Sequence, residues 1–273
     1  LSGFSGAICV SQSTRNECLQ RGFDEEKTYV VKNGVDSNIG DISFDRTIVE
    51  KLQNNFGIDI TDKHILVTLG RPVKRKGFSW FLKNVMPYLN KDICLMMVGP
   101  MKSEFSFIEK SLQAMSNNFN HNVQLMLGLA SDVKDVEEQL KLQENVFHLG
   151  SLPYTDLLQV LSLADLFIMP NIHVEGDIEG FGLVALEASM CETFVLASGI
   201  EGITDAVING ENGYLLPSEN APIWIEKIHE LLSDKEKLKV LSEYGKEFTR
   251  RNYSWDIMVN EYKAIFDEFI ATS

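Results

Sequence analysis

A cluster of basic side chains between residues 71 and 76 could bind a charged ligand. Lys or Arg fills four of these six positions: Arg71, Lys74, Arg75 and Lys76. The cluster follows a short apolar run and precedes a predicted helix that begins near Gly77. A helix N-terminus offers free N–H groups and a positive dipole end, which suits a phosphate group. Arg71 could contact two phosphate oxygens and Lys76 could act as a point charge; the alternative is a solvated basic loop.

The segment from Glu179 to Glu187 is a second candidate site. A Gly-Phe-Gly sequence at 180–182 stands directly before a predicted helix that opens near Leu183. The glycines allow a ligand to approach the backbone, and the N–H groups of Leu183 and Val184 would point out of the helix start. Each of the two carboxylates could accept hydrogen bonds from a vicinal diol of a sugar or ribose. The alternative is that Glu179 caps the helix and Glu187 is simply exposed.

Short apolar runs alternate with helical patterns along the middle of the chain. The predicted strands are residues 64–69, 93–98, 123–127, 146–149, 165–169, 194–197 and 213–216. The predicted helices lie near 77–89, 103–116, 133–142, 153–163, 183–190 and 221–233. This alternation predicts an α/β fold with a doubly wound parallel sheet that is covered on both faces. Ligands bind outside the carboxyl ends of such strands, which is where both candidate segments lie.

The charge balance excludes some classes of partner. The 273 residues include 25 Lys and Arg against 39 Asp and Glu, a net charge of -14. Such a surface repels nucleic-acid phosphates over a long range, so we expect no nucleic-acid partner. No apolar run approaches the roughly 20 residues of a transmembrane helix. The four cysteines form no CxxC pair, which is typical of a reduced, cytoplasmic protein.

The loop before the second candidate helix also raises the question of a metal. Four possible ligands alternate along it: His173, Glu175, Asp177 and Glu179. The glycine and the twelfth-position Glu that support a hard-cation loop are absent, so we expect no metal here. The chain also contains neither a GxGxxG fingerprint nor a P-loop motif, so the sequence gives no support for a dinucleotide-binding Rossmann site or for a P-loop nucleotide site.

An ordered set of short motifs resembles one known family. Glu179 and Glu187, around Glu-Gly-Phe-Gly-Leu-Val, resemble the signature of retaining GT-B glycosyltransferases, the group that includes glycogen synthase. Gly70-Arg71 with Lys76-Gly77 resembles the diphosphate loop of that family. Weaker matches are Asn33-Gly34-Val35-Asp36, Val98-Gly99, Phe147 to Gly150, Ala164-Asp165 and Asn209 to Gly213. Each motif is weak alone, but the set keeps the family order over nearly the whole chain.

The resemblance implies that a nucleotide diphosphate sugar is the donor and that its sugar is transferred with retention. Arg71 and Lys76 would neutralise the diphosphate, and Glu179 would hold the sugar hydroxyls, so these three are the expected catalytic residues. Glu187 would bind the ribose, and the turn after Gly150 would contact the base. The other expected donor-binding residues are Gly70, Gly180, Phe181, Gly182, Leu183 and Val184. Preorganised cations can stabilise a diphosphate leaving group, so no cofactor or metal is expected.

The resemblance also implies a domain division. Residues 1–36 would be a remnant of an N-terminal acceptor domain, 37–63 a linker, 64–250 the donor-binding Rossmann-like domain, and 251–273 a helix packing toward the N-terminal domain. We expect that domain to be mostly missing, and the fragment alone to bind donor weakly and lack transferase activity. The acceptor is left open as a glycan, a lipid-linked sugar or a protein, in polysaccharide or glycoconjugate biosynthesis. The expected location is cytoplasmic, with the missing domain as a route to peripheral membrane contact.

Two departures from the family pattern follow the helix near 183–190. Glu192 and Phe194 stand where the family usually has glycine and proline. An extra acid near an anion site would weaken donor binding or alter the sugar choice, unless it points to solvent. Two other functions are alternatives. One is a different GT-B enzyme such as a nucleotide-sugar epimerase, which needs another acid/base set. The other is a non-catalytic scaffold that binds a nucleotide sugar.

Overall fold

The main sheet has six parallel strands in the order β5-β4-β3-β6-β7-β8 among the described residues. The structure is a computed structural model that describes residues 6–101 and 131–271, so the predicted helix at 103–116 and strand at 123–127 lie outside the described residues. The strands are β3 (His64–Leu69), β4 (Ile93–Val98), β5 (Val146–Gly150), β6 (Leu166–Met169), β7 (Phe194–Ser198) and β8 (Gly213–Leu216). The predicted α/β fold with a doubly wound parallel sheet is confirmed.

The strand order reverses between β3 and β6. β3 is the first strand of the sheet along the chain, and it pairs with β4 on one side and with β6 on the other. Such a reversal sends the two following connections to opposite faces and leaves a crevice at the carboxyl ends of the two strands. The loops that begin at residues 70 and 170 therefore meet at this switch point.

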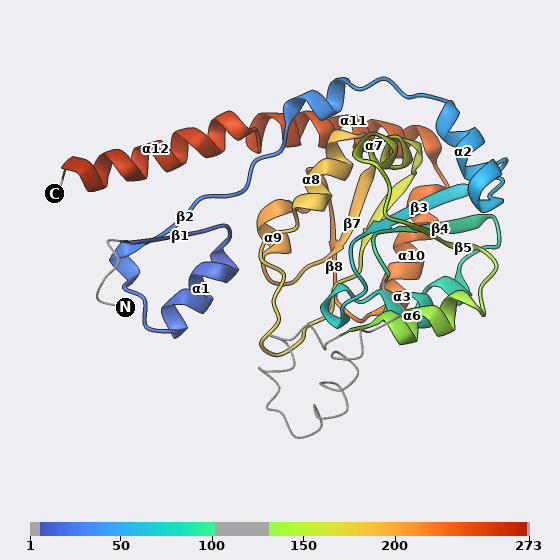
Figure 1. The fold of residues 1–273 in the computed structure, drawn as a ribbon, viewed down its shortest axis with the longest axis horizontal. Coiled ribbons are helices and arrows are strands. Elements are labelled where there is room, and N and C mark those ends of the chain that lie inside the picture. Colours follow the sequence, from blue (N-terminus) through green and yellow to red (C-terminus); the bar gives the residue numbers. More distant parts are fainter. Residues whose placement is uncertain (1–5, 102–130, 272–273) are drawn as a thin grey trace.

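Helices cover both faces of the sheet (Figure 1). β6 shows why both faces must be covered, since Phe167 and Met169 enter one core and Leu166 and Ile168 enter the other. One core contains side chains of α2 (Thr47–Phe56), α7 (Tyr154–Leu163), α8 (Leu183–Met190) and α9 (Ile203–Ala206). The opposite core contains side chains of α3 (Phe78–Asn84), α6 (Val133–Leu140) and α10 (Ala221–Leu232).

The predicted helix at 77–89 is shorter than expected. α3 ends at Asn84, and a separate 3₁₀ turn, η4, spans Met86–Tyr88. Pro87 explains the break, because proline has no N–H and disfavours helical backbone in the residue before it. The other 3₁₀ turns are η1 (Glu25–Lys27), η2 (Ser37–Asp41) and η3 (Lys74–Lys76).

The first and the last described elements of the chain lie side by side. β1 (Ala7–Cys9) and β2 (Thr28–Val30) form a small parallel sheet around α1 (Gln12–Gln20), which is the strand–helix–strand pattern of the sequence. α11 (Lys235–Asn252) packs on the main sheet, and α12 (Trp255–Ala271) extends away from it toward β2 (Figure 1). The Tyr29 and Phe269 rings, whose centroids are 5.6 Å apart, join this last helix to residues 6–36, which we call the first segment.

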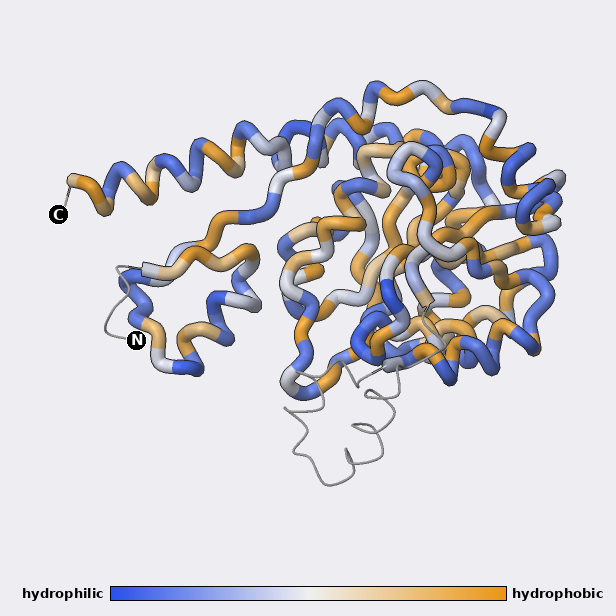
Figure 2. The backbone as a smooth tube through the Cα atoms, viewed as in Figure 1, coloured by the Kyte–Doolittle hydropathy of each residue, from blue (hydrophilic) through white to orange (hydrophobic). Residues whose placement is uncertain are grey.

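The segment between the first 36 residues and β3 packs onto the main sheet. Ile39, Ile48, Leu52 and Ile58 are buried in the same core as α7 and α8. Apolar residues concentrate in the sheet layer, while α12 alternates between apolar and polar positions (Figure 2). Within residues 6–101 and 131–271, no helix has both the length and the hydropathy needed to cross a membrane.

Candidate functional site

The basic loop and the end of β6 are in direct contact. Gly77, with φ of +65°, lies so close to β6 that a Cβ atom on it would fall 2.0 Å from the Pro170 carbonyl oxygen. The Ile172 N–H donates to the Arg75 carbonyl oxygen at 2.9 Å. Only glycine permits this approach at that backbone angle. The two segments singled out in the sequence are therefore brought together at the switch point.

Charged side chains from the two loops meet there. The Lys76 Nζ lies 2.6 Å from the Glu179 Oε2, and these side chains are only 13% and 12% exposed. Arg75 adds weaker contacts, with its Nε 3.3 Å from the Asp177 Oδ1 and 3.9 Å from the Glu179 Oε2. Charges that water screens poorly interact more strongly than at the surface. The site thus holds a cation and an acid in a fixed mutual position.

The carboxylate of Glu179 has a second partner from the end of β6. The Asn171 Nδ2 donates to Oε2 at 3.0 Å, and Asn171 itself is buried. The Asn171 Oδ1 is buried without a hydrogen-bond partner among the described residues. All these contacts use Oε2, and within the described part of the chain no hydrogen bond to Oε1 is seen. Glu179 therefore keeps one oxygen as an acceptor for a ligand hydroxyl.

The start of α8 presents two free backbone donors. Leu, Ala and Met favour the helix intrinsically, and Ala185 and Leu186 bury one of its sides. The N-cap is Gly182 at φ of +99°, which has no side chain to accept hydrogen bonds from the first amides of the helix. Within the described residues, the amides of Leu183 and Val184 have no hydrogen-bond partner. The alternative in which Glu179 caps this helix is wrong, because that side chain binds Lys76 instead.

Glu187 lies one turn further along α8, against the start of α7. The Tyr154 hydroxyl donates to the Glu187 Oε1 at 3.3 Å, and Tyr154 follows the Gly150 turn by four residues. Burial raises the pKa of the Glu187 carboxyl above its usual range, and the hydrogen bond from Tyr154 offsets part of that rise. Burial, then the neighbouring Glu187 charge, raises the pKa of Tyr154 to about 12. Glu187 is thus half-buried beside the turn after Gly150, so the exposed alternative is wrong.

The remaining predicted residues divide into surface and core positions. Arg71 is exposed and makes no ion pair among the described residues, and Gly70 lies behind it, near the stem of Lys76. Phe181 turns its side chain into the core, 6.3 Å from the Tyr253 ring, so this side chain is not available to a ligand. Gly180 precedes it and contacts the turn that follows β7.

Glu192 and Phe194 lie at the other end of the sheet from the candidate site. Glu192 follows the last turn of α8 and forms an ion pair with Lys246 at 2.6 Å. Phe194 begins β7 and packs buried against the Tyr214 ring at 5.2 Å. Of the two alternatives for Glu192, the structure supports the one in which it points to solvent, because its side chain is 48% exposed. It is not near the candidate anion site, because the amino and carboxyl ends of parallel strands lie at opposite edges.

The alternating polar residues of the 173–179 loop turn to different partners. His173 faces Glu201 at 3.1 Å, while Asp177 and Glu179 face the two basic residues named above. Within the described parts of the chain, no group of three or more His, Cys, Asp or Glu could hold a metal ion. Asp177 and Glu179 are thus engaged with cations of the protein itself.

Sequence reasoning missed Asn171 and Glu201. Glu201 accepts a hydrogen bond from the Glu179 N–H at 2.6 Å. A signal for both exists, because each follows the carboxyl end of a predicted strand, where ligands bind in such sheets. Their partners could not be predicted, since the contacts join loops from different strands.

The chain is similar to one family of proteins and to several of its members. Residues 50–248 match the family described as glycosyl transferases group 1. The chain is 22% identical over 270 residues to the capsular polysaccharide biosynthesis glycosyltransferase CapM of Staphylococcus aureus, covering 97% of this chain and 62% of CapM. It is 25% identical over 256 residues to a D-inositol 3-phosphate glycosyltransferase of Corynebacterium glutamicum, covering 91% and 53%.

A solved structure shares the fold. The crystal structure of Anabaena Alr3699/HepE in complex with UDP and glucose superposes with a TM-score of 0.73 at 20% identity. The match covers 96% of this chain and 63% of the HepE chain. The chain thus spans less than two thirds of the length of these relatives.

Proposed function

Because the chain belongs to the group 1 glycosyltransferases, we propose that it forms the donor-binding half of an enzyme that transfers a sugar from a nucleotide diphosphate sugar to an acceptor with retention. The observation that carries the proposal is the contact between Lys76 and Glu179 at the switch point. It supports the proposal because Lys76 would face a phosphate and Glu179 would accept from sugar hydroxyls, and Glu179 precedes the start of α8 by four residues.

The first part of the proposed mechanism concerns the leaving group. Breaking the bond between the sugar and the diphosphate leaves negative charge on the diphosphate, and preorganised donors lower the barrier when they face that charge. Lys76 is held in place by Glu179, and the Leu183 and Val184 amides point out of the start of α8. Arg71 is exposed, and its guanidinium would bind the outer phosphate through two oxygens. These groups need no metal to stabilise the developing charge.

The second part concerns the sugar and the nucleoside. The Glu179 Oε1 accepts a hydrogen bond from a sugar hydroxyl, with the backbone of residues 180–182 alongside. Glu187 binds the ribose, and the turn after Gly150 contacts the base, because the contact with Tyr154 joins these two places. The acceptor, which is a glycan, a lipid-linked sugar or a protein, is not assigned to any residue of this chain. The family match favours neither an epimerase nor a non-catalytic scaffold.

Calorimetric titration of the chain with UDP, GDP and ADP tests this proposal. UDP is the first probe because the HepE structure contains it. We expect one of the three to bind at 1:1 stoichiometry, with no sugar transfer by this chain alone. The absence of heat with all three would contradict the donor site. Binding without transfer by a longer protein that includes the N-terminal part would favour the scaffold instead.

A further inference from the structure

We propose that Glu201 is a positioning residue that fixes the backbone of Glu179, so that the Glu179 carboxylate faces the donor sugar. This inference rests on the proposed function, because it assigns a support to the residue placed on the sugar. Glu201 follows β7, 22 positions after Glu179 in the sequence, and the fold brings the two loops together.

The Glu201 carboxylate connects two points of the 173–179 loop. Its Oε2 accepts the Glu179 N–H at 2.6 Å, and its Oε1 lies 3.1 Å from the His173 Nδ1. The Glu201 side chain is 10% exposed, so water competes weakly for its bond with the Glu179 N–H, whereas His173 is 71% exposed. An ionised carboxylate forms stronger hydrogen bonds to N–H groups than a neutral acceptor does. One side chain therefore restrains the loop at both of its ends.

The backbone of the same turn also contacts Glu179. The Gly202 N–H donates to the Glu179 carbonyl oxygen at 3.1 Å. A Cβ atom on Gly202 would lie 2.1 Å from the Gly180 carbonyl oxygen, so the two backbones touch. Both polar backbone groups of Glu179 are thus bound by residues 201 and 202, while its side chain is bound by Lys76 and Asn171.

The backbone angle of Glu201 is unusual for its residue type. Its φ is +52°, in the left-handed region, where glycine is the residue without strain. Backbone strain persists where surrounding contacts enforce it, and it often marks functional positions. The Thr204 hydroxyl donates to the Glu201 carbonyl oxygen at 2.9 Å and closes this turn. The carboxylate, rather than the backbone, explains why a glutamate stands here.

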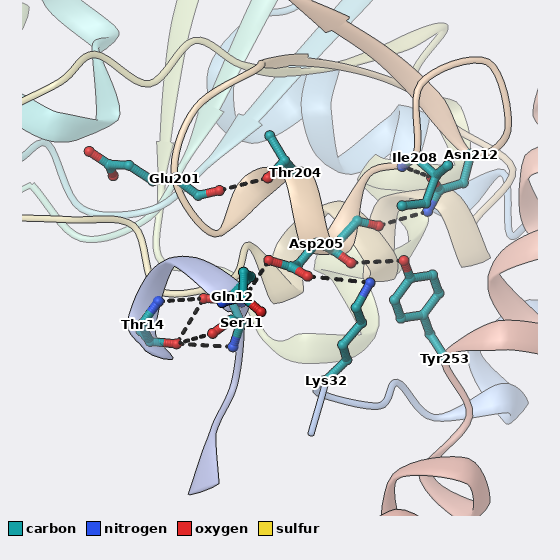
Figure 3. Close-up of polar contacts among 11 residues, drawn as sticks. Ser11, Gln12, Thr14, Lys32, Glu201, Thr204, Asp205, Ile208, Asn212 and Tyr253 are labelled. Atoms are coloured by element: carbon teal, nitrogen blue, oxygen red, sulfur yellow. Dashed lines mark hydrogen bonds and ion pairs between the residues drawn. The ribbon is translucent and has the colours of Figure 1, made fainter. Parts of the chain in front are cut away.

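The turn that carries Glu201 is itself anchored. In α9, the Asp205 Oδ2 accepts the Gln12 N–H at 2.9 Å, and the Oδ1 lies 3.3 Å from the Lys32 Nζ. The Tyr253 hydroxyl donates to the Asp205 carbonyl oxygen at 2.8 Å (Figure 3). A supporting residue positions a site well only when its own element is fixed. These contacts give Glu201 a rigid base between the first segment and the end of α11.

Hydrogen exchange at the Glu179 amide, measured by NMR on the whole chain, tests the contact without any ligand. We expect E201A and E201G to raise the exchange rate of this amide at least about tenfold over wild type. E201Q keeps an oxygen acceptor and should restore most of the protection. The alanine and glycine variants differ in backbone strain, so a shared effect excludes strain as its cause. The matched control is E192G, because Glu192 has φ of +60° at the opposite end of the sheet.

Calorimetry with UDP and with UDP-glucose as probes tests the consequence for the sugar. In E201A and E201G, the affinity for UDP should stay within about twofold of wild type, while UDP-glucose should bind at least about fivefold more weakly. Unchanged exchange at the Glu179 amide would overturn the positioning role. Faster exchange with unchanged UDP-glucose affinity would overturn its link to the sugar. If wild type binds neither probe, the proposed function fails, and the exchange result still decides the contact.

Discussion

The side chains of Lys76 and Glu179 depend on each other. Each is largely buried, and each is the other's nearest opposite charge, at 2.6 Å. Removing one partner from such a pair leaves an uncompensated charge in a poorly solvated place. Substitution of either residue therefore mixes a loss of ligand contact with a loss of local structure. Exposed or half-buried neighbours give cleaner tests at the scale of single residues.

Arg71 offers such a test of diphosphate binding. Its side chain is exposed and unpaired among the described residues, so R71A should leave the thermal stability unchanged. We expect the affinity for UDP to fall at least about tenfold, that is about 1.4 kcal/mol or more. The matched control is K74A, which removes an exposed cation of the same loop. Equal losses for both variants, measured by calorimetry, would indicate general attraction rather than a specific contact.

The half-buried carboxyl of Glu187 predicts a pH dependence of stability. Burial raises the pKa of Glu187 in the folded protein above the value of 4.5 that it has in the unfolded chain, so the folded state favours the protonated carboxyl more than the unfolded state does. By proton linkage, the contribution of Glu187 to the free energy of unfolding is complete below pH 4.5 and is lost as the pH rises through the pKa of the folded state. The melting temperature of wild type relative to E187Q, which stays neutral, should therefore fall over this window. A difference that does not change with pH would contradict the raised pKa.

Glu187 also has a predicted ligand contact. E187A should weaken UDP binding, because it removes the acceptor proposed for the ribose. Unchanged affinity for UDP would contradict that role, whatever the pH profile shows. Y154F serves as the control, since it removes the hydrogen bond to Glu187 while leaving the carboxylate in place.

At the scale of elements, hydrophobic pattern made the sheet and its helices predictable. Runs such as 93–98, buried at every position, read directly as covered parallel strands. The order of the strands was not predicted, because the connection rules of such sheets leave several topologies open and only the folded structure selects one. The contacts of Asn171 and Glu201 were not predictable, because they join residues from separate loops whose register only the folded structure fixes.

The close approach of the basic loop to β6 predicts a strong effect at Gly77. G77A should destabilise the fold by more than the 1–2 kcal/mol expected for a positive φ alone, since a Cβ would meet the Pro170 carbonyl oxygen at 2.0 Å. The matched control is G57A, at φ of +67°, where a Cβ meets nothing within 4 Å. Urea unfolding measures both. An equal loss of unfolding free energy in the two variants would show that the loop moves away from Pro170 without destabilising the fold, and would contradict the prediction.

At the scale of the whole molecule, α9 joins the first segment to the main sheet. The side chain of Asp205 is 14% exposed and contacts both Gln12 and Lys32. The position of the first segment thus depends on the same turn that supports Glu179. The net charge of -14 means that the proposed anionic donor would need a local cationic site on an otherwise acidic surface, and the basic loop is the candidate for that site.

Substitution of Asp205 should release the first segment. D205A leaves the Gln12 amide and Lys32 without their acceptor, and we expect about 1–3 kcal/mol lower stability and faster proteolysis within residues 12–34. The control is D41A, whose ion pair with Arg250 involves a side chain that is 69% exposed and should contribute less than about 1 kcal/mol. Cleavage rates that match those of wild type would refute the anchoring role.

The most direct test of the central claim is a crystal structure of this chain with UDP-glucose bound. We expect the diphosphate to lie between Lys76 and the amides of Leu183 and Val184, with a glucose hydroxyl on the Glu179 carboxylate. A diphosphate bound away from the switch point of β3 and β6, or a sugar turned away from Glu179, would contradict it.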